Sequence, residues 1–202
     1  MIRSVFVQRR VLELYRTLDV LTYPIDPSEV LDQLPCACRI MSYSDVAKAS
    51  HGSVQEVISM CNSNTGATHF DAGRRQYLIM YNDAQNLGRI RWTKAHEIGH
   101  IILGHFDAMQ NQCIAEGETR EFARQFEQEA DYFAWNLIAP LPIMREMHID
   151  SIEQTRCTFG LSAQAAALHF DRYVKWSRSH VKTAWENNML REFRCKYRES
   201  HP

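Results

Sequence analysis

The sequence predicts an α+β fold that is mostly helical, with a small antiparallel sheet in front of one functional helix. Two observations carry this prediction. Residues 67–82 form two β-type runs on either side of a glycine-containing turn, which is typical of a β-hairpin. Amphipathic patterns bounded by proline, glycine or capping residues cover most of the remaining chain. With 45% hydrophobic and 23% charged residues over 202 positions, the composition is that of a globular protein with a full core.

The elements before the hairpin follow from local signals. The predicted order is a helix over residues 4–19, a short helix over about 27–34, a strand over 38–43 and a short helix over 53–60. Asp26 is the expected N-cap of the second of these, because Pro27 fits the first position of a helix.

Helices dominate the chain after the hairpin. The predicted order is a helix over about 84–104, a polar connection over 106–117, a long helix over 118–138, shorter helices over 141–147 and 150–157, and a further helix from 162. We interpret residues 1–173 as one domain, with 1–20 as its N-terminal helix. Residues 174–202 are then a basic C-terminal extension, helical or loosely ordered.

A His-Glu-x-x-His pattern, His96-Glu97-Ile98-Gly99-His100, lies in the helix predicted for residues 84–104. Residues four apart share a helix face, so His96 and His100 offer two ring nitrogens to one metal ion. Glu97 is turned about 100° from His96, where it reaches an attacking water without binding the metal. The pattern indicates a zinc-dependent hydrolase. The alternative is a buried helix whose histidines only make hydrogen bonds, and a third ligand elsewhere would argue against it.

The predicted third ligand is Glu127, on the helix over 118–138. Glu127 and Asp131 share a helix face, whereas Glu129 lies about 200° away, on nearly the opposite side. Asp131 is placed to accept the ring N–H of a metal-binding histidine, which would fix that ring. Glu129 is expected to be an exposed or salt-bridged surface residue. Two histidines and one glutamate leave a fourth position open, which is typical of a catalytic site holding one Zn²⁺ ion.

Charge and composition argue against several classes of protein. The net charge of −1 gives no general attraction to nucleic acid or membranes, so direct nucleic-acid binding is not expected. No run approaches the roughly 18 apolar residues of a membrane span. Charges interrupt the first ten residues, where a signal peptide needs an apolar stretch. We therefore expect a cytoplasmic protein whose six cysteines are free thiols.

The two long helices carry further sequence signatures. Residues 96–105 read HEIGHIILGH, residues 127–140 read EQEADYFAWNLIAP, and a predicted strand ending at residues 81–83 precedes them. Residues 159–168, FGLSAQAAAL, follow. Together these resemble the ImmA/IrrE family of metallopeptidases over about residues 20–173. One departure is His169-Phe170, where the family usually has an arginine and a leucine.

The resemblance implies a zincin-like, gluzincin-type peptidase domain. By it, the zinc ligands are His96, His100 and Glu127, and Glu97 is the catalytic base. Family members, often encoded by phages, mobile elements or stress regulons, typically inactivate a helix-turn-helix transcriptional repressor by cutting it. The expected substrate is therefore such a repressor or a similar regulatory protein.

A further donor is needed to stabilise the oxyanion that forms during peptide hydrolysis. The sequence does not choose among the candidates, which are Tyr81, His105, Arg156, His169 and Tyr173. His105 is expected at or past the end of its helix, turned away from the metal if the helix continued regularly.

Two hypotheses compete with a peptidase. Zinc could stabilise a binding module that recognises a repressor without cutting it, although such a module has no use for Glu97. Alternatively, residues 159–173 could imitate a helix-turn-helix, next to a segment over 172–198 with eight basic and two acidic residues. Such a segment is more often a solvated helix and tail than a nucleic-acid surface.

Overall fold

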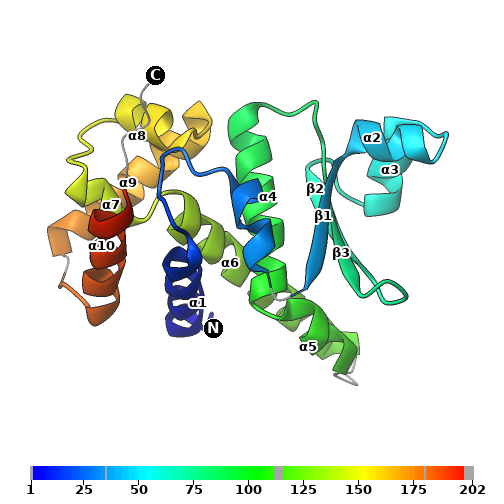
Figure 1. Cartoon of the computed structure of the whole chain (residues 1–202), viewed down its shortest axis with the longest axis horizontal. Helices are drawn as coiled ribbons and strands as arrows, with labels where there is room; N and C mark the ends of the chain where they lie inside the picture. The colour runs from blue at the N-terminus through cyan, green and yellow to red at the C-terminus, as the bar shows by residue number, and fades with distance from the viewer. Residues whose placement is uncertain (1, 35, 112–115, 180, 198–202) are drawn as a thin grey trace.

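The computed structural model describes residues 2–34, 36–111, 116–179 and 181–197. In chain order its elements are α1 (Ser4–Thr17), η1 (Pro27–Gln33), β1 (Ala37–Ser42), α2 (Tyr43–Ala49), α3 (Val54–Cys61), β2 (Gly66–Asp71), β3 (Gln76–Tyr81), α4 (Leu87–Ile102), α5 (His105–Asn111), α6 (Glu116–Ile138), α7 (Leu141–Glu146), α8 (Ile152–Phe159), α9 (Ala163–Ser179) and α10 (Ala184–Lys196). The predicted α+β class is confirmed. Figure 1 shows the sheet with α2 and α3 at one end, α7 to α10 at the other, and α4 and α6 between them.

The sheet has three strands in the order β1-β3-β2. β2 and β3 form the predicted antiparallel hairpin, with Gly66 opposite Tyr81. β1 pairs with β3 in parallel, with Ala37 opposite Gln76, so the sheet is mixed and not purely antiparallel. Parallel neighbours need a long crossover, and α2, α3 and β2 supply it. Helix α2 is not among the predicted elements. Ser42 caps it by accepting the backbone N–H of Asp45 at 3.0 Å.

Capping residues set several helix ends where the sequence placed them. Asp26 accepts the backbone N–H of Ser28 at 2.9 Å and begins η1. Ser53 begins α3 in a capping box with Glu56. Gly104 adopts a φ of 70°, a left-handed conformation that ends α4 and favours glycine.

The segment between the two long helices differs from the prediction. The polar connection expected over 106–117 begins instead as helix α5, because Gly104 redirects the chain and allows a new helix to start at His105. Residues 112–115 of that connection lie outside the described part. For the C-terminal segment, the prediction left open a helical or a loosely ordered chain, and the structure shows a helix, α10.

The division at residue 173 stays a prediction. α9 runs across this position, and α10 packs against α1. Met189 and Phe193 of α10 belong to the same hydrophobic core as Val11 of α1. Arg198, the last basic residue of the predicted extension, lies outside the described residues.

Close packing of α4 against α6 positions the functional helix. A Cβ atom at Gly99 would lie 3.0 Å from Cδ1 of Phe133, so the glycine allows the two helices to approach. Ala134, a small residue of α6, is fully buried. Within the described part of the chain, no helix combines the length and apolar character that crossing a membrane requires.

Candidate metal centre

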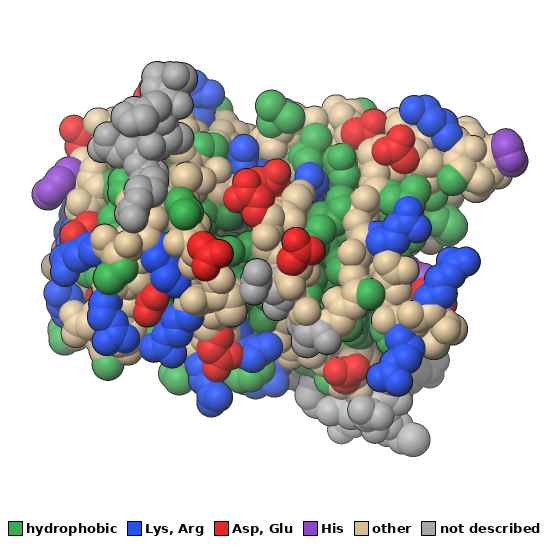
Figure 2. All heavy atoms as spheres, in the orientation of Figure 1, with side chains coloured by type: hydrophobic (Ala, Val, Ile, Leu, Met, Phe, Trp, Pro, Cys, Tyr) green, Lys and Arg blue, Asp and Glu red, His purple; other side chains and the backbone are tan. Residues whose placement is uncertain are grey.

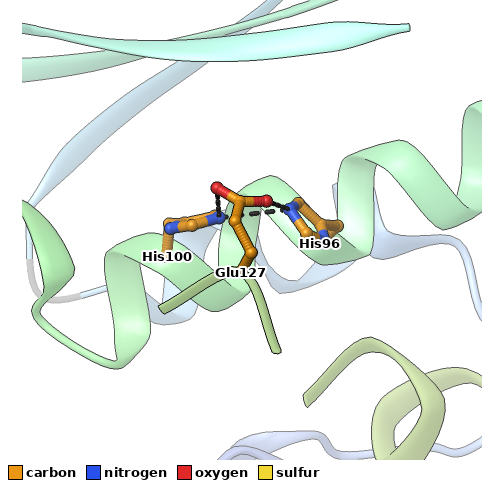
Figure 3. Close-up of side chains that lie close together, drawn as sticks. All are labelled: His96, His100 and Glu127. Atoms are coloured by element: carbon orange, nitrogen blue, oxygen red, sulfur yellow. Dashed lines mark hydrogen bonds and ion pairs between the residues drawn. The ribbon is translucent and has the colours of Figure 1, made fainter. Parts of the chain in front are cut away.

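Three side chains from two helices converge at one point. His96 and His100 come from α4, and Glu127 reaches them from α6 (Figure 3). The Nε2 atoms of the two histidines are 3.1 Å apart. Glu127 Oε2 lies 3.2 Å from His96 Nε2, and its Oε1 lies 3.5 Å from His100 Nε2. The predicted pairing of these two helices is therefore present.

The spacing and chemistry of this donor set fit a divalent metal ion. Tetrahedral ligands about 2.0–2.1 Å from Zn²⁺ stand about 3.3–3.4 Å from one another. The three separations, 3.1, 3.2 and 3.5 Å, bracket that value. The described residues contain one cluster of three histidine, cysteine or acidic side chains whose donor atoms all lie within 4.8 Å of one another, and it is this trio. One glutamate with two imidazoles is the donor mixture of a catalytic site with an open position.

His96 is held from its outer side by Asp131. The distance from His96 Nδ1 to Asp131 Oδ1 is 3.0 Å. The helix spacing predicted that Asp131 would contact one of the two histidines but did not choose between them. Burial favours the neutral ring, but the carboxylates of Asp131 and Glu127 outweigh it and raise the pKa of His96 to about 9. The carboxylates around this ring therefore attract a cation.

His100 is held in a different way. Its Nδ1 lies 3.0 Å from Nδ1 of His105, whose Nε2 lies 3.3 Å from Glu129 Oε2. Burial and the neighbouring His96 lower the pKa of His100, and burial lowers the pKa of His105 to about 4. Both rings are thus neutral near pH 7.

The prediction that Glu129 lies at the surface is wrong. Its side chain is fully buried and binds Arg3, which donates from its backbone N at 2.9 Å and from Nη2 at 2.7 Å. Burial acts to raise the pKa of Glu129, but hydrogen bonds from Arg3 and Gln125 outweigh it and lower the pKa to about 2. The prediction that Glu129 points away from the metal, about 200° around the helix from Glu127, agrees with the structure. It did not reveal that α1 covers this side of α6.

His105 also lies elsewhere than a regular helix would place it. α4 ends at Ile102, the chain turns at the left-handed Gly104, and His105 begins α5, fully buried beside His100. Its ring stacks on Phe126, with centroids 4.3 Å apart. His105 therefore contacts the back of a candidate ligand and does not face the open side of the centre.

Glu97 lies beside the centre and contacts the sheet. Thr68 of β2 donates its hydroxyl to Glu97 Oε2 at 2.7 Å. Burial raises the pKa of Glu97, and the Thr68 hydroxyl acts in the opposite direction. Thr68 is not among the predicted site residues, although its place on a strand of the hairpin before the motif helix was a usable signal.

The centre opens into a cleft of about 1120 Å³ between α4, α6, α9 and the edge strand β2. His96, Glu97, His100 and Glu127 all line it, together with residues 62–68. Trp92 and Trp135 form part of the wall, with ring centroids 4.2 Å apart. The cleft is large enough for several residues of a polypeptide.

The predicted oxyanion candidates lie away from this cleft. Among the described residues that line it, Tyr81, His105, Arg156, His169 and Tyr173 do not occur. His169 is buried, stacks on Trp135 and lies 2.6 Å from the carbonyl oxygen of Ala139 through Nε2. Tyr81 is covered by Lys94, and Arg156 pairs with Glu153. The geometry thus offers no support for an oxyanion role of these side chains.

A comparison with known families identifies the fold around this centre. The model of the Peptidase_M78 family, described as an IrrE N-terminal-like domain, matches residues 53–170. The matched region contains all of α4 and α6 and hence the whole His-His-Glu cluster. No curated protein matches the chain. Since the match covers more than half of the sequence, the chain belongs to the Peptidase_M78 family of peptidases.

Proposed function

We propose that the protein is a zinc-dependent endopeptidase that cuts a regulatory protein, such as a helix-turn-helix transcriptional repressor. The observation that carries the proposal is the convergence of His96, His100 and Glu127 within 3.1–3.5 Å, beside the carboxylate of Glu97. When bound, Zn²⁺ supplies Lewis acidity that polarises a scissile carbonyl and lowers the pKa of water.

Glu97 is the proposed general base. Its carboxylate lines the cleft, and burial raises its pKa toward the range in which it can both take and return a proton. It would accept the proton of the attacking water and deliver that proton to the leaving amine nitrogen. The Thr68 hydroxyl keeps the carboxylate oriented while this happens.

The cleft favours an extended polypeptide as the substrate. β2 is an edge strand with β3 as its described neighbour, and its first residues, 66–68, line the cleft. An extended peptide gains main-chain hydrogen bonds when it pairs with such an edge. The choice of a repressor rests on the resemblance to the ImmA/IrrE family.

The basic C-terminal segment gives little support to nucleic-acid binding. Lys175 pairs with Asp171, Arg194 with Glu146 and Lys196 with Glu192. Figure 2 shows positive and negative side chains interspersed over the part of the surface where α1 and α10 lie. A mixed surface lacks the single-sign field that attracts a phosphate backbone.

Cleavage of a repressor is the direct test. The zinc-loaded chain and repressors encoded beside its gene are mixed, and fragments are followed by mass spectrometry. We expect cleavage by the parent protein and by Glu153→Gln, a control at an exposed ion pair. Glu97→Gln should bind zinc as tightly but lose about 10²–10⁴-fold in rate. Cleavage at the parent rate by Glu97→Gln would refute the mechanism, and zinc binding without cleavage of any repressor would favour a binding module.

A further inference from the structure

A continuous hydrogen-bonded chain runs from the candidate metal ligand His100 to the N-terminal segment. It passes through His105 and Glu129 and ends at Arg3. Both middle members are fully buried, so water does not substitute for them. Arg3 lies outside residues 53–170, the part of the chain that matches the family.

The ring chemistry fixes the direction of each hydrogen bond. His100 Nε2 faces His96 and Glu127, so a metal ligand at that nitrogen leaves the ring proton on Nδ1. That Nδ1–H then donates to Nδ1 of His105, which must carry its own proton on Nε2. His105 Nε2–H donates to Glu129, a carboxylate that only accepts. Each of the three groups therefore has one consistent role.

Arg3 anchors the far end of this chain. Its backbone N, Nε and Nη2 donate to the two Glu129 oxygens at 2.7–3.1 Å, and Gln125 adds a donor at 2.9 Å. Such a charge-assisted, two-pronged contact fixes the carboxylate in orientation as well as in position. Because Arg3 precedes α1, the contact ties the start of the chain to α6.

We propose that His105, Glu129 and Arg3 are positioning residues of the metal centre, so that docking of the N-terminal segment controls how tightly the centre holds its metal. The inference rests on the proposed function, because it takes His100 as a ligand. Partners that orient a metal-bound histidine fix its tautomer and raise its basicity. Here the orienting partner is reached through a second histidine and secured by a residue outside the family match.

Zinc affinity of the full-length chain tests the proposal. His105→Phe keeps a ring to stack on Phe126 but removes the acceptor for His100, and we expect about 10–100-fold weaker binding by chelator competition. His105→Asn can still accept from His100 and should recover part of the loss. Arg3→Ala should weaken binding by about two- to tenfold, with Arg3→Lys in between. Arg9→Ala, at an exposed ion pair, is the matched control and should bind like the parent.

The imidazole spectrum separates positioning from a general structural role. In the zinc-loaded parent, long-range ¹H–¹⁵N correlations should show His100 bound through Nε2 with a slowly exchanging Nδ1–H. His105→Phe should lose that slow exchange, and Arg3→Ala should shift the Nε2–H of His105. If His105→Phe does not fold, Arg3→Lys decides, because it keeps a positive charge beside the buried Glu129 carboxylate and the Arg3 side chain is 46% exposed.

The outcomes distinguish this inference from the proposed function. If the His100→Ala variant binds zinc as tightly as the parent protein, both the proposed function and the positioning role are overturned. Loss of zinc in His100→Ala, with folded His105→Phe and Arg3→Ala variants that bind zinc like the parent, would overturn only the positioning role.

Discussion

His96 and His100 lie one helical turn apart, yet their outer ring nitrogens meet opposite surroundings. His96 contacts Asp131, whose side chain is 55% exposed. His100 contacts His105 and, through it, Glu129, both fully buried. Water can replace a partner on the exposed side, whereas each member of a buried network is needed to satisfy the others. The outer half of the centre, His96 with Asp131, therefore tolerates a change of partner. The inner half, His100 with His105 and Glu129, is part of the folded core.

The pH dependence of zinc binding is the largest effect expected from this contrast. The pKa of His96 is raised to about 9, so near neutral pH it carries a proton that the metal must displace. The pKa of His100 is lowered, so its ring is already neutral and contributes no proton. One displaced proton makes the apparent affinity rise about 100-fold from pH 6 to pH 8 and level off above about pH 9. Chelator competition across this range measures the slope.

A pH dependence that corresponds to two protons displaced per zinc ion would mean that both rings are charged in the metal-free protein. A slope of zero would mean that neither is. Either result would remove the electrostatic difference between the two histidines. His148, an exposed histidine outside the group of His96, His100 and Glu127, can be replaced by Gln as a control that should leave the slope unchanged.

Stability of the metal-free protein should also differ between the two halves. Glu129→Ala removes a buried carboxylate with several charge-assisted donors, which we expect to lower the free energy of unfolding by about 2–3 kcal/mol. Asp131→Ala removes an exposed carboxylate and should cost less than about 1 kcal/mol. Urea unfolding in the presence of a chelator compares the two. Equal losses would contradict the distinction between a buried and an adaptable half.

Zinc affinity should respond to Asp131 in a graded way. Asp131→Ala leaves His96 Nδ1 to water, and we expect about tenfold weaker binding, the lower end of the usual range for such partners. Asp131→Asn keeps an acceptor oxygen and should lose less. Asp171→Asn, which changes an exposed pair with Lys175, is the matched control. Asn and Ala variants with the same affinity would show that the hydrogen bond to His96 has no role.

The smallest effect on activity is expected where Thr68 of the sheet contacts Glu97. Thr68→Val removes the hydroxyl bonded to Glu97 and should lower kcat about three- to tenfold, with zinc affinity unchanged. Thr68→Ser keeps the hydroxyl and should retain most of the activity. Steady-state kinetics and chelator competition on the same samples test this. A change in zinc affinity at constant kcat would place Thr68 with the metal ligands instead of the base.

Much of the fold and half of the centre could be predicted from local sequence. The hairpin, η1 and the helices α1, α3, α4 and α6 follow from periodicity and from signals such as the Asp26 cap. The contact of Asp131 with a metal-binding histidine follows from two spacings of four residues on two helices, although those spacings do not choose His96 over His100. These features depend on residues close together in the sequence, where helical geometry is a sufficient guide.

The inner half could not be predicted because it depends on long-range packing. Glu129 is buried by a residue 126 positions earlier in the chain, and no periodicity reports such a contact. The position of His105 depends on Gly104, whose left-handed conformation between α4 and α5 changes the direction of the chain. The parallel pairing of β1 likewise requires knowledge of where a long crossover returns.

The packing of α1 and α10 has a consequence for transplanting this peptidase into other proteins. The recognisable module spans residues 53–170, but both helices lie outside it and complete its core. A fusion that carries only the module would remove the Tyr15 hydroxyl from the Leu137 carbonyl and leave the Glu129 charge without Arg3. The part of the chain that can be transplanted is therefore larger than the region that matches the family, and a functional graft has to include both α1 and α10.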